Sequence, residues 1–106
     1  MSADATAGVV DLARALPDDG GAWASLVVAK SDVSTFRVRR MRDTAAEWHV
    51  HEAADEGFLV LAGEVVIDVE NESRRLATQQ MTIVSAGRRH RARVDGEALL
   101  LVFDAL

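Results

Sequence analysis

Short strand-like segments separated by turn signals fill the sequence from Trp23 to Phe103. β-branched and aromatic residues gather in these segments, whereas Gly, Asp, Asn and Ser gather between them. The predicted strands cover residues 23–30, 34–41, 47–52, 56–62, 65–69, 74–77, 81–84, 90–94 and 98–103. Because no helical pattern is interleaved with them, this spacing predicts an all-β sandwich or barrel.

One helix candidate precedes the strands. The segment Val9–Leu16 would place Leu12, Ala13 and Leu16 on one helical face, and Pro17 should end the helix because proline cannot donate the next backbone hydrogen bond. We therefore expect the N-terminal part of the chain to form a short helix or an extended segment beside the barrel.

The size and charge of the chain narrow its organisation and its partners. With 106 residues, we expect an N-terminal segment over 1–22 and a single barrel domain over 23–106. The net charge of −5 argues against nucleic acid or a membrane surface as a partner. The acidic stretch Met1–Gly8 does not resemble a secretory signal, and the apolar runs are too short to span a bilayer, so we expect a cytoplasmic protein. The absence of cysteine excludes disulfides and thiolate ligands.

The chain has three histidines, and all of them fall within one spacing pattern. Its two parts read H-x-H-x4-E-x6-G and G-x2-H, and they comprise His49, His51, Glu56, Gly63, Gly87 and His90. On a strand, His49 and His51 would project from the same face, because side chains alternate along a strand. Isolated histidines are usually ordinary surface or core residues, but the joint spacing favours ligands. Three imidazoles and one carboxylate suit divalent Fe, Mn, Ni, Co, Cu or Zn, so we predict one metal held by His49, His51, Glu56 and His90.

A substrate pocket is predicted beside this metal. Strand alternation puts Phe58 and Val60 on the same face as Glu56, where they would line the cavity wall. Met81 and Ile83 also alternate, and they either line the cavity or belong to the core. The predicted substrate-pocket residues are Phe58, Val60, Met81 and Arg89.

Charged residues near the histidines have two interpretations. Arg88 and Arg89 lie in the turn before His90 and could hold a carboxylate or phosphate at the mouth of the barrel, whereas Arg91 and Arg93 should point outward. The alternative is a solvated basic edge paired with the abundant acidic residues. The same two interpretations apply to the arginines of the second predicted strand, which are Arg37, Arg39, Arg40 and Arg42. The acidic residues beside the first motif, Glu52 and Asp55, either support the metal ligands or are exposed turn residues.

The final segment, residues 98–103, is apolar on both strand faces. A strand with one wet face should alternate between apolar and polar residues, so both faces of this strand need a cover. The barrel core covers one face. Either the N-terminal segment or a second subunit covers the other, and the equally apolar strand over 23–30 favours a homodimer.

The two motifs resemble those of the cupins. The spacing H-x-H-x4-E-x6-G matches the first cupin motif, and G-x2-H matches part of the second. Trp48 before the first histidine and residues 58–64 after the glutamate extend the likeness, which runs from about Trp23 to Phe103 and is to the small single-domain cupins often labelled mannose-6-phosphate-isomerase-like. The resemblance implies a small antiparallel jelly-roll barrel, a double-stranded β-helix, which is usually dimeric and has the four predicted ligands at its centre.

The second motif departs from the family pattern at three positions. Gln79, Ser85 and Val94 stand where glycine, proline and asparagine are usual. None of the three is a predicted ligand. The departures therefore bear on the substrate more than on the metal.

Two functions fit this sequence. The first is a metal-dependent enzyme with dioxygenase-, isomerase- or cyclase-type chemistry, in which Glu56 is the catalytic ligand or base and a small, largely apolar or aromatic molecule lies in the barrel. The second is a non-catalytic cupin that binds or senses a ligand and whose metal is structural. The fold alone does not decide between them, because one fold hosts many reactions.

Overall fold

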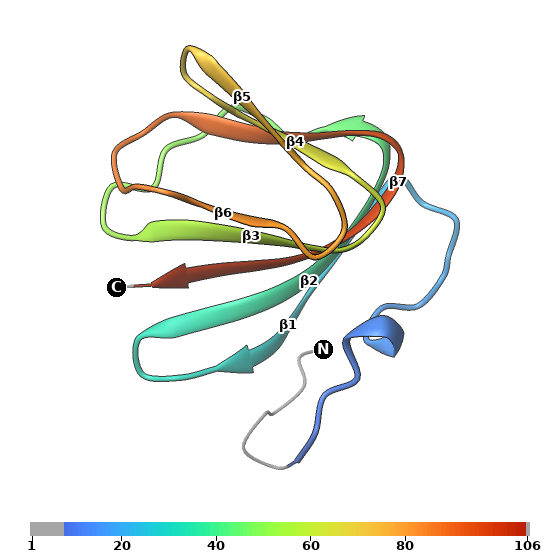
Figure 1. Ribbon diagram of the computed structural model, residues 1–106. Helices are drawn as coiled ribbons and strands as arrows, with labels where there is room; N and C mark the ends of the chain where they lie inside the picture. The colour runs from blue at the N-terminus through green and yellow to red at the C-terminus, as the bar shows by residue number, and fades with distance from the viewer. Residues whose placement is uncertain (1–7, 106) are drawn as a thin grey trace.

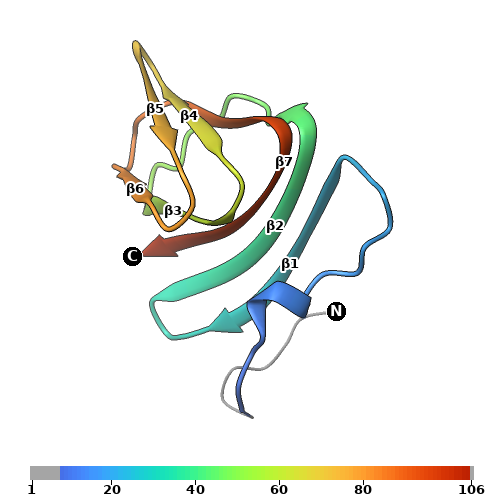
Figure 2. The ribbon, with the colours of Figure 1, turned by 45° about the vertical axis from the view of Figure 1, so that its right-hand side comes forward.

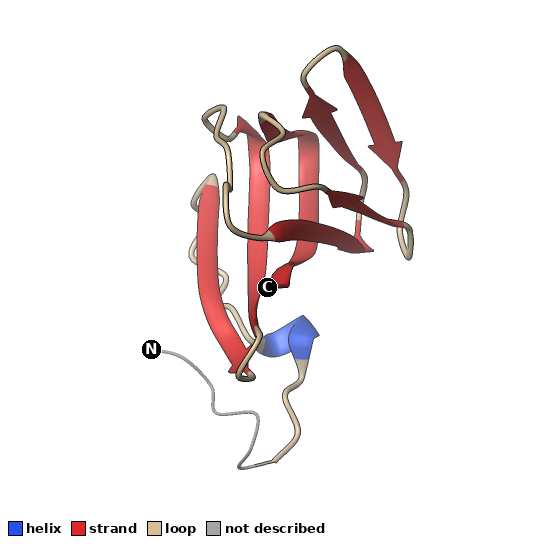
Figure 3. Ribbon diagram, turned by 90° about the vertical axis from the view of Figure 1, so that its left-hand side faces the viewer, coloured by secondary structure: helices blue, strands red, loops and turns tan. Residues whose placement is uncertain are grey.

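Seven antiparallel strands form nearly all the regular structure in the computed structural model, which describes residues 8–105 (Figure 1). The strands are β1 (Trp23–Lys30), β2 (Ser34–Ala45), β3 (Asp55–Ala62), β4 (Val65–Val69), β5 (Glu72–Leu76), β6 (Met81–Val84) and β7 (His90–Ala105). Coloured by secondary structure, the described chain shows only one helical turn beside the strands (Figure 3). The predicted all-β class is confirmed.

The last strand, β7, organises the barrel. It pairs with β2, β3 and β4, and the strand order is β1-β2-β7-β3-β6, with β5 attached through β4. Both β2 and β7 are long and curved, and they run side by side from one half of the barrel to the other (Figure 2). The antiparallel jelly-roll architecture expected from the sequence is therefore present.

The turn predicted at Asp95–Gly96 is instead a bulge within β7. The pairing of β2 with β7 shifts register between Arg42 and Thr44, and Gly96 adopts a φ of +81°. The Gly96 amide donates a hydrogen bond to Asp43 Oδ1 at 2.7 Å. A glycine at positive φ bends a strand without ending it, so two predicted strands are one continuous strand that turns the corner of the barrel.

A second prediction, a strand over 47–52, is also wrong. Residues 46–54 form an irregular connection with a single bridge, between His49 and His90. The β2 strand instead continues to Ala45 and pairs with Arg93 of β7. The backbone of this connection is bonded to β7 and to the turn before it through Ala46, His49 and His51, which keeps both histidines beside His90.

The N-terminal segment contains one 3₁₀ turn, Leu12–Arg14, in place of the helix predicted over Val9–Leu16. Asp11 caps this turn by accepting a hydrogen bond from the Ala13 amide at 3.1 Å. Short isolated helices are marginal in water, and the other described residues before β1 are irregular. No helix within residues 8–105 has the length and apolar character needed to cross a membrane.

Two arginines of β2 attach this segment to the outer face of the barrel. Arg40 Nη2 donates to the Pro17 carbonyl at 2.8 Å, and Arg42 Nη2 pairs with Asp18 at 2.6 Å. Leu16 borders the same shallow pocket as Leu99 of β7. The N-terminal segment therefore covers part of the second apolar face that the sequence left without a partner.

The hydrophobic core lies between the inner strand faces. Its members come from β2 to β7 and are Met41, Phe58, Val60, Val65, Ile67, Val69, Leu76, Val84, Ala92, Val94, Ala98, Leu100 and Val102. Alternation explains the selection, because the residues between them on the same strands face outward. The core fills the barrel behind the histidines and gives them a rigid support.

A buried carboxylate ties three strands together on the outside. Asp68 of β4 is 6% exposed and accepts hydrogen bonds from Arg93 at 2.7 Å, Arg91 at 3.0 Å and Ser73 at 2.6 Å. Burial raises the pKa of Asp68, but these donors outweigh burial and hold the pKa at about 2. Arg91 and Arg93 thus point outward, as the sequence indicated, and they hold an ionised carboxylate.

Replacing Asp68 with Asn is expected to lower the free energy of unfolding near pH 7 by about 2 kcal/mol. The pKa of Asp68 is lower in the folded state than the ordinary value of 3.8, so its stabilisation is present above that pH and is lost as the pH falls towards 2. Urea unfolding of both proteins near pH 7 and near pH 2 should show the difference shrinking in acid. Asp32→Asn, at an exposed turn carboxylate, is the control. A difference that does not change with pH would contradict the ionic origin of the effect.

Candidate metal centre

The four predicted ligands lie together at one end of the barrel. His49 and His51 come from the connection before β3, Glu56 is the second residue of β3, and His90 is the first residue of β7. Each offers a ligand atom, and these atoms all lie within 4.8 Å of one another. Residues far apart in the sequence thus form one cluster that could bind a metal.

Backbone pairing fixes where the histidines stand. The amides of His49 and His90 each donate to the other residue's carbonyl at 2.9 Å, and the two rings lie 4.3 Å apart between centroids. The Gly87 amide donates to the His51 carbonyl at 2.8 Å, with Gly87 at a φ of +84°. The glycine of the second motif therefore lets the turn before β7 approach the connection that carries the first motif.

The ring nitrogens are divided between support and ligation. Nδ1 of His49 lies 3.0 Å from the Glu47 carbonyl, and Nδ1 of His90 lies 2.9 Å from the Arg88 carbonyl. A carbonyl only accepts, so each Nδ1 carries a hydrogen and donates. The Nε2 atoms then face the cluster centre, which is the arrangement of metal-binding histidines. This donor set fits a divalent transition metal.

Glu56 joins the three histidines. Its Oε1 atom lies 3.2 Å from His49 Nε2 and 2.7 Å from His90 Nε2, and its Oε2 atom lies 3.1 Å from His51 Nε2. Burial raises the pKa of Glu56, but the histidine hydrogen bonds and charges outweigh burial and hold it at about 2. Burial lowers the pKa of His90, yet its hydrogen bond to Glu56 gives a net rise. The carboxylate is ionised, as a metal ligand must be.

The cluster is open on one side. The side chains of His90 and Glu56 are 1% and 7% exposed, whereas those of His49 and His51 are 34% and 41% exposed. Phe58 and Val60 are fully buried on the same strand face as Glu56, and the Phe58 ring lies 5.9 Å from the His90 ring. The closed side is thus core, and the open side admits solvent or a ligand.

Two predicted pocket residues lie elsewhere. Met81 pairs in register with Leu59 and is 51% exposed, and Ile83 is 43% exposed on the same outer face. The prediction that Met81 lines the cavity is therefore wrong, as is the matching suggestion for Ile83. On a four-residue strand with apolar residues on both faces, only the register with β3 decides which side chains enter the barrel.

Arg89 also points away from the cluster. Its guanidinium lies 5.0 Å from the centroid of the Trp48 ring, and that of Arg91 lies 4.9 Å from the same ring. Trp48 precedes the first histidine, and both guanidinium groups make cation–π contacts with its ring. The structure therefore places Arg89 in an outer stack, which corrects its assignment to the substrate pocket.

The acidic residues beside the first motif have structural surroundings. Asp55 is exposed and accepts a hydrogen bond from the Ala86 amide at 2.9 Å. This contact ties the start of β3 to the turn before β7. Glu52 is exposed in the connection. Glu52 therefore fits the interpretation of an exposed turn residue, whereas Asp55 is the exposed first residue of β3.

A groove beside the cluster was missed in the sequence. It has a volume of about 500 Å³ and is lined by Trp23, Arg39, Ala45, Ala46, Glu47 and His49. His49 belongs both to this groove and to the cluster. The signal was the alternation of Phe36-Arg37-Val38-Arg39, which shows that arginines share one strand face but not that this face looks into the barrel.

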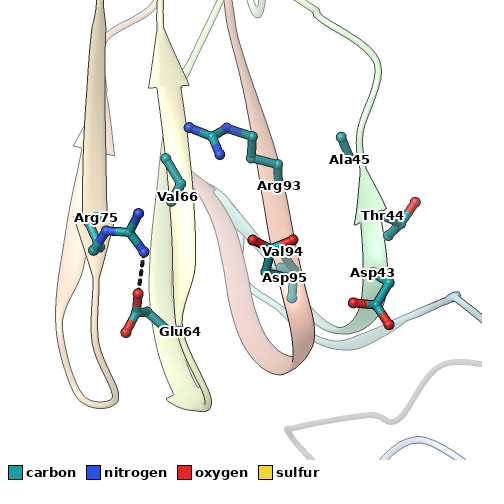
Figure 4. Close-up of a pocket in the computed structure, with 9 residues that line it drawn as sticks. All are labelled: Asp43, Thr44, Ala45, Glu64, Val66, Arg75, Arg93, Val94 and Asp95. Atoms are coloured by element: carbon teal, nitrogen blue, oxygen red, sulfur yellow. Dashed lines mark hydrogen bonds and ion pairs between the residues drawn. The ribbon is translucent and has the colours of Figure 1, made fainter.

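Another pocket lies apart from the cluster (Figure 4). It has a volume of about 340 Å³, and its lining includes Asp43, Val66 and Arg93 together with the ion pair between Glu64 and Arg75. None of the four clustered residues lines it. This pocket therefore has no part in the candidate site.

Comparisons with known proteins agree with this geometry. The family model described as a cupin domain matches residues 37–105. The crystal structure of TT1209 from Thermus thermophilus is 31% identical, with a TM-score of 0.81 over 92% of this chain and 95% of that chain. No curated protein sequence matches this chain.

Two further solved structures share the fold. A cupin-2 domain containing protein from Shewanella frigidimarina NCIMB 400 is 21% identical, with a TM-score of 0.73 over 81% of this chain and 83% of that chain. The DMSP lyase DddQ from Ruegeria pomeroyi DSS-3 is 25% identical, with a TM-score of 0.71 over 88% of this chain and 51% of that chain. With a family match over most of its length and the histidine–glutamate cluster in place, this chain belongs to the cupin family.

Proposed function

We propose that this protein binds one divalent transition metal through His49, His51, Glu56 and His90 and acts on a small molecule beside it. The observation that carries the proposal is the convergence of four ligand atoms within 4.8 Å of one another, with two of the imidazoles part exposed. Dioxygenase-, isomerase- and cyclase-type reactions all fit such a centre, with Fe, Mn, Ni, Co, Cu or Zn as the metal. We place the protein in the cytoplasm.

The residues of the chain have separate tasks in this proposal. The backbone carbonyls of Glu47 and Arg88 orient the imidazoles of His49 and His90. A bound metal would supply Lewis-acid polarisation of a substrate oxygen. Glu56 would hold the metal together with the three histidines, and its carboxylate would accept a proton from the substrate. The buried wall of Phe58 excludes water from the inner side of the site.

An open centre favours chemistry over a purely structural metal. Structural sites are closed by protein ligands, whereas catalytic sites keep a position for water or substrate. Here the two exposed imidazoles, His49 and His51, leave one side of the cluster accessible. The solved lyase from Ruegeria pomeroyi supports this choice, because a barrel of this fold carries an enzyme.

The groove supports a substrate with an apolar or aromatic body. Trp23, Ala45 and Ala46 present apolar surface along it, and its volume of about 500 Å³ is within the usual range for small-molecule sites. A substrate lying there would meet the cluster at His49. The groove thus takes the place of the pocket wall that the sequence assigned to Met81 and Arg89.

The test is a screen of protein loaded separately with each metal. Oxygen uptake and the turnover of enolisable carboxylic acids and ketones would be measured against Glu56→Ala loaded in the same way. We expect turnover with at least one metal, and a loss of roughly a hundredfold or more in the variant. Equal rates in the two proteins would contradict the catalytic proposal and leave the binding-module interpretation.

We also propose that the protein is a homodimer. Exposed and half-buried apolar side chains share the outer face of β6, β3 and β7, and they are Leu59, Met81, Ile83, Leu101 and Phe103. Apolar residues gathered on one sheet face favour association with another surface. A second copy of the chain would cover this face and leave the groove on the inner side open.

Ile83→Glu is expected to convert the dimer into a monomer, because it places a charge within the apolar face. Light scattering after gel filtration should give twice the chain mass of 11.5 kDa for the wild type and the single mass for the variant. Val33→Glu, at a 57% exposed residue in the β1–β2 turn, is the control and should remain dimeric. A monomeric wild type would contradict the proposal.

A further inference from the structure

Two arginines of β2 share the strand face that carries the cluster. Arg39 pairs with Leu100, which pairs with Val60, and Arg37 pairs with Val102, whose other partner is Phe58. Directly paired residues of an antiparallel sheet lie on the same face. The two arginines therefore look towards the inside of the barrel, as Glu56 and the core residues of β3 do.

Arg39 is a half-buried cation without an ion-pair partner among the described residues. Its Nε atom is inaccessible and makes no hydrogen bond, and neither Arg37 nor Arg39 forms an ion pair or side-chain hydrogen bond with any part of the chain that the structure describes. Both oxygens of Glu56 are already bonded to histidines. Partial burial of a guanidinium without a carboxylate partner is costly, so this group is suited to bind an anionic ligand beside the cluster.

The surroundings of Arg39 agree with this cost. Burial lowers the pKa of Arg39, and the charge of Glu56 opposes that shift. The guanidinium therefore lies within electrostatic range of the cluster. Arg37 adds a second positive charge that also lowers the pKa of Arg39. An anion bound by Arg39 would offset both the burial and the repulsion from Arg37 that lower the pKa of Arg39.

Trp23 holds Arg39 in a useful orientation. The Arg39 Cζ atom lies 4.5 Å from the centroid of the Trp23 ring. The terminal Nη1 and Nη2 groups of Arg39 form no ion pair or hydrogen bond with the described residues, so both can donate to a carboxylate through two parallel hydrogen bonds. Trp23 is 43% exposed and provides apolar surface in the groove that Arg39 also lines.

The groove described above joins Arg39 to the cluster. Arg39, Trp23 and His49 all line this groove, and His49 is also a member of the cluster. Glu47 also lines the groove, so a ligand with a second negative charge would meet repulsion there. The combination of one free guanidinium, an indole and alanine surface favours an organic monocarboxylate over a phosphate.

We propose that Arg39, held against Trp23, binds the carboxylate of a small monocarboxylic acid whose apolar body lies in the groove and whose far end reaches the histidine cluster. This inference rests on the proposed function, because it names the class of molecule that the centre acts on. Arg39 is a substrate-binding residue in this scheme. Arg37 strengthens the positive potential along the same face.

Titration with benzoate and phenylacetate tests the site, with benzamide and phenylacetamide as neutral isosteres. The fluorescence of Trp23 reports binding in a Trp48→Phe background, since the chain has only two tryptophans. We expect saturable binding of at least one acid, and we expect its amide to bind at least roughly tenfold more weakly than the acid. Arg39→Gln should remove this preference, whereas Arg75→Gln, at an exposed arginine of β5, should keep it. No saturable binding of either acid, or an unchanged preference in Arg39→Gln, would overturn the inference.

Thermal unfolding separates ligand binding from a structural role. Arg39→Gln removes a half-buried cation that has no ion-pair partner among the described residues, so the melting temperature of the ligand-free protein should stay constant or rise. A fall of roughly 8 °C or more would assign Arg39 to the fold and overturn the inference. Arg39→Lys keeps the charge but lacks the two-point geometry, and should bind the acids more weakly than the wild type.

Metal content distinguishes this inference from the proposed function. The titrations are first made on chelator-treated protein and then repeated after loading with Zn²⁺, and Arg39→Gln should take up as much metal as the wild type. Carboxylate binding by a protein that takes up no metal would contradict the proposed function and support the Arg39 site. Metal uptake without any preference for carboxylates would support the proposed metal centre and contradict the Arg39 site.

Discussion

Glu56→Ala is expected to lose the bound metal. The change removes the only carboxylate of the cluster, and with it the negative charge that all three histidines contact. Metal affinity should fall at least about 100-fold, because removing a residue that only hydrogen-bonds to a metal ligand can already lower metal affinity by about that factor. Elemental mass spectrometry on protein purified without chelator should give about one metal per chain for the wild type and almost none for the variant.

His51→Ala supplies a cleaner version of the same test. Its side chain is 41% exposed, so its removal should leave the core packed and the barrel folded. Glu52→Ala is the matched control, since it removes an exposed carboxylate from the same connection. Circular dichroism should show β structure in all three variants. Full metal occupancy in His51→Ala would remove His51 from the ligand set, and a metal-free wild type after loading would contradict the metal centre altogether.

The cluster could be predicted because its residues are rare and their spacing is local. The chain has three histidines, and two of them, His49 and His51, lie a few residues before Glu56, so one short segment supplies three of the four ligands. His90 could be added only because its motif resembles that of a known family. Physically, the sequence does not show that His49 and His90 share a backbone pair, since that contact joins segments far apart along the chain.

The errors arose where long-range pairing decides the outcome. Asp95–Gly96 has the composition of a turn, but the neighbouring β2 strand continues past it, so the chain forms a bulge and β7 goes on. Met81 has no intrinsic preference for either face of a short strand, and its register with β3 places it outside. Local sequence patterns contain neither of these facts.

The position of Arg39 also could not be predicted from the local sequence. Alternating arginines and apolar residues on a strand normally indicate a wet outer face and a buried inner face. Here Val38, between the arginines, is fully buried on the outer side of β2, and Arg39 faces the groove. Only the pairing of β2 with both β1 and β7 reveals which face lines the site.

Gly63→Ala is expected to destabilise the protein by about 3 kcal/mol or more. Gly63 has a φ of +81°, which costs an alanine about 1–2 kcal/mol. A Cβ atom at this position would also lie 2.3 Å from the Glu97 carbonyl oxygen and 3.0 Å from the Ala98 Cα atom. Both are backbone atoms of β7, so the turn between β3 and β4 would have to move away from it. Thermal unfolding should show a fall of roughly 12 °C or more.

Gly96→Ala separates the two costs. Gly96 has the same φ of +81°, but a Cβ atom there would meet nothing within 4 Å. Gly96→Ala should therefore cost only the same conformational penalty of about 1–2 kcal/mol, and the difference between the two variants measures the contact with β7. Equal losses would show that the positive φ alone requires glycine at Gly63. A larger loss in Gly63→Ala, with metal content per folded chain unchanged, would show that the last glycine of the first motif serves the packing of β7 rather than the metal.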